Sequence, residues 1–504
     1  GVGVGGGGGG ISGDKPVIDK TRQAVERLEA ERSARRRAMK NRKIEREAAE
    51  RHNLAQGNPG DVDFIGLVSD WRDSGALKKS PHVQKGAEKI CICVRKRPIS
   101  EKERKKKDHD SITCCNPTVV VHSAKLKVDG ITKYLDHNQF HFDHSFDEAE
   151  TTEDLYKYTT MPLVDFVVSG KGGRATCFAY GQTGSGKTYT MSGIQVMVAE
   201  DIFMLLASNE ESSSSSSSSS SPQGPCRSSD TVVTVSFFEL YGGRCQDLLN
   251  DRHRLKILED GKGEVVVTGL EEYQANDPSD FLTLVDAGNR NRTTHATEAN
   301  DTSSRSHAIC QILLRDKSTG RLRGKLSLVD LAGSERGSDT KSHNRQRRTE
   351  SSEINKSLLA LKECIRALDT GGTASAQNHV PYRASKLTLV LKDCFTSALA
   401  KTTMIATVSP GASSCDHTLN TLRYADRVKE KKAGVVSDAK RREREVEKGA
   451  MRERQARKAR EMRKQFGMDE AEDGPGEEYY DDERGAERDL PPPPAGRRGS
   501  KENN

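Results

Sequence analysis

Gly181-Gln182-Thr183-Gly184-Ser185-Gly186-Lys187-Thr188 is the stretch that decides the fold of this chain. It follows an apolar run at residues 175–180, which predicts a buried strand, and a helix is expected from Thr188 onward. Glycines let several backbone N–H groups point at one phosphate chain, and a helix N-terminus adds partial positive charge. A glycine-rich turn is the ordinary alternative, but the strand–loop–helix context favours a phosphate-binding P-loop. Lys187 is then predicted to reach the β- and γ-phosphates, and Thr188 to ligate Mg²⁺.

A second signal lies at the end of another apolar run, where Asp330 is followed three residues later by Gly333. Here a carboxylate can hold a water bound to Mg²⁺, and the glycine N–H can sense the γ-phosphate. The stretch 300–307 adds hydroxyl groups, with Ser303 assigned to the metal and Ser304 to the positioning of water. Together these residues predict a switch that changes when the γ-phosphate leaves.

Arg305 and Glu335 carry opposite charges on these two candidate switches. An ion pair between them would close the pocket around a bound γ-phosphate, and Glu335 would relay the proton from the attacking water. The guanine-reading pattern Asn-Lys-x-Asp is not completed at residues 355–358, which argues for ATP over GTP. The sequence therefore predicts an ATPase that uses Mg²⁺.

Strands alternate with helices around the P-loop, which predicts an α/β fold with a mostly parallel sheet covered by helices. Further strands are expected at residues 90–94, 119–121, 139–146, 232–240, 308–315, 325–329 and 402–409. Further helices are expected at residues 153–168, 281–289, 354–368, 385–396 and 418–431. A hairpin that carries residues 125–133 joins two of the early strands.

Composition favours one large domain with polar extensions. The chain has 504 residues, of which 33% are hydrophobic and 31% charged, as in a globular core diluted by polar arms. The net charge of +7 favours an acidic partner, and without a recognisable nucleic-acid-binding motif a protein partner is expected. Eleven cysteines without CxxC pairing, together with no signal peptide or membrane-length apolar run, predict reduced cytosolic thiols and no membrane partner.

Shifts in composition divide the chain into five expected segments. Residues 1–13 are glycine-rich and expected to be disordered, and residues 14–87 form a basic helical neck with a short amphipathic helix near residues 63–72. The large domain spans residues 88–432 and contains a disordered serine insertion at 212–221. A basic helical extension at 433–465 and a disordered acidic and proline-rich tail at 466–504 follow. The neck is either a solvated charged helix or an electrostatic tether to a polyanion.

Five motifs together resemble the kinesin motor domain. They are the stretches 181–188, 300–307, 330–336, 354–361 and 419–425. The resemblance covers about residues 88–432 and implies a P-loop NTPase-type fold in which ATP hydrolysis is coupled to microtubule binding. It also implies an adenine pocket, lined by Arg95, Arg97, Pro98 and Tyr189.

Lys127-Val128-Asp129, at the tip of the early hairpin, resembles the Lys-Val-Asp finger of kinesin-13 proteins. A charged hairpin tip is the ordinary alternative, but several other stretches are also similar to that class. They are residues 130–135, 258–262, 362–366 and 425–430. The resemblance implies an internal motor that binds tubulin at microtubule ends, stabilises curved protofilaments and uses ATP hydrolysis to recycle. The alternatives are a plus-end-directed walking kinesin and a non-catalytic microtubule-binding scaffold.

A basic face is expected to bind acidic tubulin, although a solvated surface charge is the ordinary alternative for each of its cations. Besides the hairpin tip, its residues are Lys341, Arg347, Lys362, Arg366, Arg383 and Lys386. The resemblance also implies a cytoplasmic location on the cytoskeleton, at microtubule ends or on spindle or flagellar microtubules. A homodimer would form through regions outside this sequence.

Overall fold

The computed structural model describes residue 3 and, with internal gaps, residues 15–428. The gaps are residues 57–58, 85–88, 131, 215–223, 262, 294–303, 336–344, 369–379, 394–396 and 398. The side chains of residues 15–21, 212–214, 293, 345–348 and 366–368 also lie outside the description. The expectations for the glycine-rich start, the serine insertion beyond residue 214 and the segments 433–465 and 466–504 fall outside the described residues.

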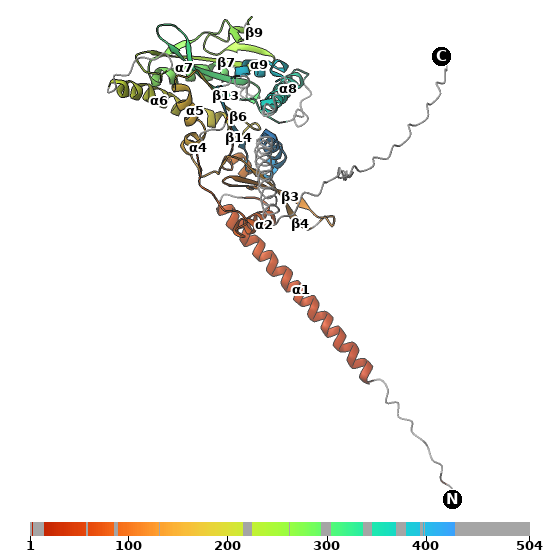
Figure 1. Cartoon of the computed structure of the whole chain (residues 1–504). Helices are drawn as coiled ribbons and strands as arrows, with labels where there is room; N and C mark the ends of the chain where they lie inside the picture. Colours follow the sequence, from red (N-terminus) through yellow and green to blue (C-terminus); the bar gives the residue numbers. More distant parts are fainter. Residues whose placement is uncertain are drawn as a thin grey trace, which may run out of the picture. The chain divides into compact units, whose positions relative to one another are not determined.

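A long mixed sheet forms the centre of the domain (Figure 1). Its strand order is β10-β9-β8-β7-β12-β13-β6-β14-β1-β5, and β11 pairs with β7. The bounds are β1 Ile90–Lys96, β5 His144–Phe146, β6 Gly173–Tyr180, β7 Thr231–Tyr241, β8 Arg244–Asp247, β9 Arg254–Glu259, β10 Val265–Thr268, β11 Tyr273–Ala275, β12 His307–Asp316, β13 Leu322–Asp330 and β14 Ala400–Val408.

The sheet is parallel in one half and antiparallel in the other. Strands β13, β6, β14, β1 and β5 run parallel, whereas β12, β7, β8, β9 and β10 pair antiparallel. The α/β fold is therefore confirmed, but the prediction of a mostly parallel sheet holds only for the half that carries the P-loop. The other half contains strands joined by tight turns, such as the one from Tyr241 to Arg244, and strands joined in this way pair antiparallel.

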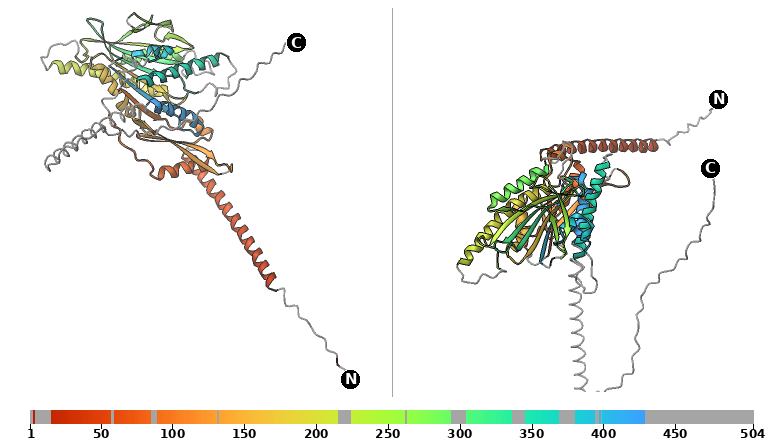
Figure 2. Two further views of the ribbon diagram at one scale, coloured as in Figure 1. Left: turned by 45° about the vertical axis from the view of Figure 1, so that its right-hand side comes forward. Right: turned by 90° about the horizontal axis from the view of Figure 1, so that it is seen from above.

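Helices cover both faces of the sheet (Figure 2). One face packs against α4 Thr152–Thr159, α5 Met161–Val168, α6 Lys187–Ser214 and α7 Pro278–Thr293. The other packs against α8 Arg345–Leu368, α9 Lys386–Val390 and a helix at 415–428. Short elements complete this domain: α3 Glu101–Lys105, η2 Tyr382–Ala384 and η3 Ala412–Ser414.

Alternate side chains of β6 enter the two cores, as the period of a strand requires. Cys177 and Ala179 pack on the side of α5 and α6, and Phe178 and Tyr180 pack on the side of α8. Within the described part of the chain, α6 alone is long and apolar enough to cross a membrane by length and composition. It packs against α5, α7 and the sheet, so its place in the core accounts for its apolar composition.

A second sheet has three antiparallel strands, β2 Ile112–Cys115, β3 Thr118–Leu126 and β4 Lys133–His141. It carries the predicted hairpin, whereas β2 is not predicted from the sequence. The neck forms two helices, α1 Lys15–Ala55 and α2 Val62–Asp73. The predicted amphipathic helix is thus confirmed as α2, and it contacts β4.

Several predicted helices have different bounds in the structure. Helix α7 is longer at both ends than the predicted 281–289, and α9 ends at Val390, before the predicted residue 396. Two further differences have a cause in the sequence. The run 153–168 is two helices, because Pro162 lies in the first turn of α5 and has no N–H with which to continue α4. Helix α8 begins at Arg345 rather than near residue 354. Its first turns are polar, so the apolar period that predicts a helix starts only at Ile354.

Candidate nucleotide-binding site

The P-loop connects β6 to α6 in the parallel half of the sheet. Gly184 and Gly186 have φ angles of +76° and +99°, which side chains other than glycine rarely adopt. The buried Nζ of Lys187 donates to the carbonyl oxygens of Gly181 and Gln182, each at 3.0 Å. A phosphate entering the loop would offer this ammonium a charged acceptor in their place. The loop is therefore shaped for the polyphosphate that its sequence predicts.

Asp330 ends β13, the parallel neighbour of β6, so its carboxylate lies beside the start of α6. Thr188 Oγ1 donates to Asp330 Oδ2 at 2.7 Å. The other carboxylate oxygen, Oδ1, is buried and has no hydrogen-bond partner among the described residues. A buried, unpaired carboxylate oxygen beside a hydroxyl fits Mg²⁺, which prefers hard oxygen ligands. Ser303, the third predicted ligand, lies outside the described residues.

Arg292, at the end of α7, belongs to this site and is not predicted from the sequence. Its Nη1 donates to Asp330 Oδ2 at 2.6 Å, and its Nη2 donates to the carbonyl oxygen of Ser306 at 3.0 Å. The side chain is 3% exposed, so it compensates the buried charge of Asp330. The sequence does hold a signal: Arg292 continues the buried stripe of Phe281 and Val285 at helical spacing.

The segment after β13 packs directly on the P-loop and on Ser304 of the first switch, the name used for residues 300–307. The Gly333 N–H donates to the carbonyl oxygen of Ser304 at 2.8 Å. A Cβ at Gly333 would overlap the carboxylate of Glu335 and the hydroxyl of Thr183, so a side chain at this position would displace both groups. The predicted γ-phosphate sensor thus lies where the two candidate switches meet the P-loop.

The predicted ion pair between Arg305 and Glu335 is absent from this conformation. Both carboxylate oxygens of Glu335 are used by Thr183: one accepts its N–H at 2.9 Å and the other accepts its hydroxyl. Arg305 instead pairs with Glu350 of α8 at 3.4 Å. Glu350 is buried and also accepts the hydroxyl of Tyr241 at 2.9 Å, so it is held in place to receive the guanidinium.

His307 links both switch segments to α8. Its Nδ1 accepts the N–H of Ala332 at 3.1 Å, so Nε2 carries the proton and donates to Ser357 Oγ at 2.8 Å. Burial is the main cause that lowers the pKa of His307, to about 3, and the nearby charges of Arg292 and Lys187 add to it. The ring is therefore neutral at physiological pH and keeps the tautomer that both hydrogen bonds require.

Arg95 and Tyr189 form the predicted adenine side of the site. Tyr189 is 73% exposed, and the Arg95 guanidinium lies over its ring, 5.4 Å from the centroid. Arg95 donates to the hydroxyls of Thr190 and Thr152, at 3.0 and 2.8 Å. These bonds hold the guanidinium beside an open aromatic face, on which a purine can stack.

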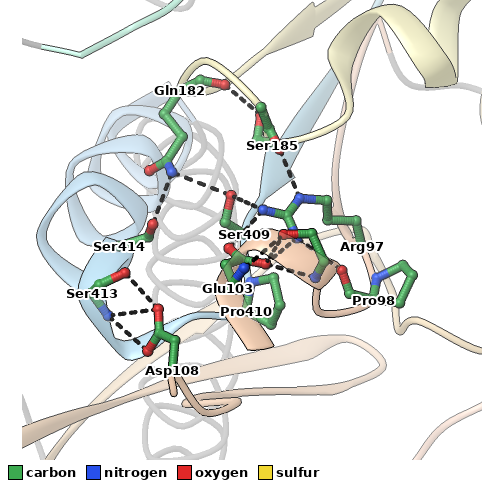
Figure 3. Close-up of polar contacts among 12 residues, drawn as sticks. Arg97, Pro98, Glu103, Asp108, Gln182, Ser185, Ser409, Pro410, Ser413 and Ser414 are labelled. Carbon is green, nitrogen blue, oxygen red and sulfur yellow. Dashed lines mark hydrogen bonds and ion pairs between the residues drawn. The ribbon is translucent and has the colours of Figure 1, made fainter. Parts of the chain in front are cut away.

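Arg97 ties the P-loop to the start of the domain (Figure 3). Its Nε donates to the carbonyl oxygen of Gly184 at 2.7 Å, and its two Nη atoms pair with Glu103 at 2.8 and 2.7 Å. The carbonyl oxygen of Pro98 accepts a further bond from Arg97, at 2.8 Å. Burial works to raise the pKa of Glu103, but the hydrogen bonds from Arg97 and Ser100 outweigh it and hold the pKa at about 2.

Gln182 extends the same network to the segment after β14. Its amide donates to the hydroxyls of Ser409 and Ser414, at 3.2 and 3.1 Å (Figure 3). Ser409 also accepts from Arg97 at 3.2 Å. The P-loop is therefore supported by the residues that lead into the helix at 415–428.

Arg383 and Lys386, two of the candidate tubulin contacts, are exposed and already make contacts within the chain. Arg383 pairs with Glu259 at 2.7 Å, and Lys386 donates to the carbonyl oxygen of Gly243. Both residues line a cavity of about 430 Å³ that α8 and Arg305 also line. The structure thus gathers these cations beside the first switch, and their contact with tubulin stays a prediction.

The remaining candidate cations lie on or before α8. Lys362 is half-buried, and its Nζ lies 5.9 Å from the ring centroid of Tyr424. Lys341 lies outside the described residues, as do the side chains of Arg347 and Arg366. Lys362 is therefore the one candidate on α8 whose side chain the structure describes.

Lys127-Val128-Asp129 occupies the tip of the β3–β4 hairpin, as predicted. Lys127 and Val128 are exposed, and Gly130, with φ of +68°, closes the turn. Asp129 accepts the N–H of Thr132 at 2.8 Å and also its hydroxyl. The aspartate therefore braces the turn from within, and the lysine and valine face solvent.

Comparison with known proteins agrees with this geometry. A family model of the kinesin motor domain matches residues 95–431, which include the P-loop, both switch segments and α8. The diatom spindle kinesin-1 of Cylindrotheca fusiformis is 58% identical over 428 residues, which cover 84% of this chain and 64% of the length of that relative. As a family, kinesin motor domains bind ATP and Mg²⁺, hydrolyse ATP and bind microtubules. The site and the family match lead to one conclusion: the chain belongs to the kinesin motor-domain family.

Proposed function

We propose that the chain is an ATP-dependent, microtubule-depolymerising kinesin of the kinesin-13 class. The observation that carries the proposal is the β3–β4 hairpin, which presents Lys127 and Val128 to solvent on a turn braced by Asp129. A cation next to an apolar side chain suits a cleft between tubulin subunits, whose surface is acidic. Such a tip would fit a bent junction between subunits better than a straight one.

ATP hydrolysis is assigned to residues of the described site. Asp330 and Thr188 would hold Mg²⁺, which would neutralise phosphate charge when bound. Lys187 would exchange its two carbonyl acceptors for the β- and γ-phosphates. Glu335 would leave Thr183 and take the proton of the attacking water, with Arg305 released from Glu350 to pair with it. The conformation described here is then the one before the switches close.

Depolymerisation follows if the motor binds curved tubulin better than the straight lattice. A ligand shifts an equilibrium only by its differential affinity for the two states, so preference for the curved state weakens the polymer end. ATP turnover would then release tubulin and return the motor to the start of its cycle. Stimulation of the ATPase by tubulin belongs to the same proposal.

The charge of α1 and the name of the relative support a place on microtubules. Between residues 20 and 51 this exposed helix holds 12 basic and 6 acidic residues, which suits a diffusive tether to an acidic lattice. The diatom relative is named a spindle kinesin, so a cytoskeletal location on spindle microtubules is proposed here as well. A walking kinesin would have the same ATP site, and the experiment below separates the two.

The test records filament length and particle motion together, with the full chain, ATP and stabilised microtubules. Shortening from both ends without directed motion is expected, and directed motion without shortening would refute the depolymerase. The paired variant Lys127→Ala/Val128→Ser should abolish shortening and leave lattice binding unchanged. It keeps Asp129, because loss of that carboxylate would disturb the turn itself. Lys256→Ala, at an exposed position of strand β9, is the matched control.

A further inference from the structure

Within the described part of the chain, the outer half of the β3–β4 hairpin has no third strand. Strand β2 pairs only with residues 118–121 of β3. Beyond them, residues 122–126 of β3 pair with residues 133–137 of β4. On the β2 side, the N–H of His122 still donates to the carbonyl oxygen of Ser111 at 2.9 Å, and among the described residues no strand pairs with residues 123–126 on that side. An isolated two-stranded hairpin is marginally stable in water, so this part needs another support to hold its tip in one place.

Helix α2 contacts the inner end of this outer half through its last turn. The Trp71 ring lies edge-on to His122, with centroids 4.7 Å apart, and stacks on His137 at 5.2 Å. Arg72 donates through Nε to the Thr113 hydroxyl at 2.8 Å and through Nη2 to Asp110 at 3.0 Å. The last turn of α2 is thus fastened to β2, β3 and β4 together.

The first turn of α2 contacts the outer end, next to the tip. Lys133, the first residue of β4, donates to both oxygens of Asp61, at 2.7 and 2.5 Å, and to Asp63 at 2.8 Å. Asp61 is the N-cap of α2 and accepts the N–H groups of Asp63 and Phe64, so the lysine grips a fixed helix end. Lys133 Nζ also lies 5.1 Å from the Phe64 ring centroid.

The two contact regions match in spacing. Asp61 and Trp71 are ten residues apart along a helix, or about 15 Å at 1.5 Å per residue. Lys133 and His137 are four residues apart along a strand, or about 14 Å at 3.4 Å per residue. Helix α2 therefore lies along β4 and contacts it near both ends of the unsupported part.

We infer that α2 is a splint for the outer half of the hairpin, with Lys133 as the positioning residue that fixes the tip. The splint takes the place of the missing third strand. Its role in disassembly rests on the proposed function, because a tip that wedges between subunits must resist bending. The neck then contributes mechanically through α2, besides any electrostatic attraction through α1.

The test measures hydrogen exchange and Trp71 quenching by acrylamide in the full chain. Trp71 is the one tryptophan of the sequence, so its fluorescence reports the docking of α2 without a label. We expect Lys133→Ala to speed exchange at residues 123–126 and 133–136 by roughly fivefold or more and to increase quenching. Lys133→Arg should restore both values, and Lys256→Ala should leave both unchanged. Unchanged exchange in β6 shows that the variants fold.

Arg72→Ala, at the other end of α2, is an independent variant with the same expected direction. The splint is refuted if the Trp71 quenching rises in these variants while exchange in the hairpin stays the same, or if neither changes. In the shortening assay, Lys133→Ala should lose roughly fivefold in rate with lattice binding unchanged; full shortening with a loosened hairpin would refute the mechanical role. If the wild-type chain does not shorten filaments, the proposed function is refuted but the splint is not. The hydrogen-exchange data then show by themselves whether α2 supports the hairpin.

Discussion

Asp330 joins three parts of the nucleotide site with one carboxylate. Its Oδ2 accepts from Thr188 of the P-loop helix and from Arg292 of α7, while Oδ1 has no partner within the described residues. Thr188 and Asp330 are adjacent as the motifs predict, because parallel neighbours β6 and β13 end at the same edge. Arg292 lies near the end of α7, 38 residues before Asp330 in the sequence, and no local pattern encodes that distance.

Replacement of Arg292 by alanine should leave the Asp330 charge buried and uncompensated. Loss of one member of a buried pair typically costs about 3–5 kcal/mol, so we expect the free energy of unfolding to fall by that order. Urea denaturation followed by circular dichroism measures it. Arg290→Ala, an exposed arginine of the same helix, is the control and should change stability by less than about 0.5 kcal/mol. Equal stability of the two variants would contradict the charge compensation assigned to Arg292.

Gly333→Ala should strongly reduce ATP hydrolysis. The added Cβ overlaps the Glu335 carboxylate and the Thr183 hydroxyl, so these two side chains must shift from the positions that join them. We expect a loss of roughly 100-fold in kcat, as for other displaced catalytic groups, with a smaller change in stability. Steady-state ATPase assays measure it. Gly261→Ala, where the Cβ position is open, is the control; near-normal turnover in Gly333→Ala would mean that this close contact is dispensable.

Helices α8 and α2 show which elements the sequence predicts well and where it falls short. The apolar period finds α8 from Ile354 onward but not its polar first turns, where Glu350 receives Arg305. The pattern finds α2 but gives no indication of what it packs against. Its partners Thr113, His122, Lys133 and His137 lie on three strands, and only the fold brings them to one face. Strand and helix periods are local, whereas these contacts depend on tertiary packing.

Docking of α2 should weaken as the pH falls. Burial is the main cause that lowers the pKa of His122, to about 3, and burial also lowers the pKa of His109, which stacks on Phe64. The groups around His122 are Trp71 and Arg72 of α2, His137 of β4, Thr113 of β2, and Asp110 and Lys96.

The docking of α2 weakens at low pH because the undocked state binds more protons than the docked state. With α2 undocked, His122 would return towards its ordinary pKa of about 6.5, so the undocked state binds more protons below that pH. Protonation of His122 therefore leaves the free energy of docking unchanged above about pH 7 and makes it less favourable by about 1 kcal/mol at pH 5.5. Trp71 quenching between pH 7.5 and 5.5 measures the change. His122→Gln removes the titrating group, so Trp71 quenching should vary less with pH in this variant than in the wild type. An equal pH dependence in the two proteins would exclude His122 as the cause of the weakened docking.

At the scale of the whole molecule, charge is distributed along the chain rather than concentrated at the nucleotide site. Helix α1 is exposed at all described side chains except the half-buried Ala49 and Asn53. It holds i,i+4 ion pairs such as Arg22 with Glu26 and Lys43 with Glu47. Exposed pairs of this kind contribute little to stability, so the excess of positive charge remains available for attraction. The sequence predicts this balance directly, because net charge does not depend on the fold.

Replacement of Arg35, Arg36 and Arg37 by glutamine should slow association with microtubules and reduce its dependence on salt. Steering between exposed charges is screened within about 8–10 Å at physiological ionic strength, so the effect should fade above about 0.3 M salt. Stopped-flow or single-particle landing rates at several salt concentrations measure it. The triple replacement by lysine keeps the charge and is the control. Basal ATP hydrolysis should stay within about twofold, and an unchanged salt dependence of landing would exclude α1 as the tether.

The contacts of helix α8 place the nucleotide switches and a candidate microtubule contact on one structural element. Its Glu350 pairs with Arg305, and its Ser357 accepts a hydrogen bond from His307. The candidate tubulin contact Lys362 lies on the same helix, nearer its C-terminal end. If lattice binding and nucleotide binding both bias the position of this one helix, the two equilibria form a closed cycle. If binding to the microtubule lattice changes the affinity for ADP by some factor, then binding of ADP must change the affinity for the lattice by the same factor. A lattice that weakens ADP binding tenfold is therefore itself bound about 1.4 kcal/mol less tightly by the ADP form.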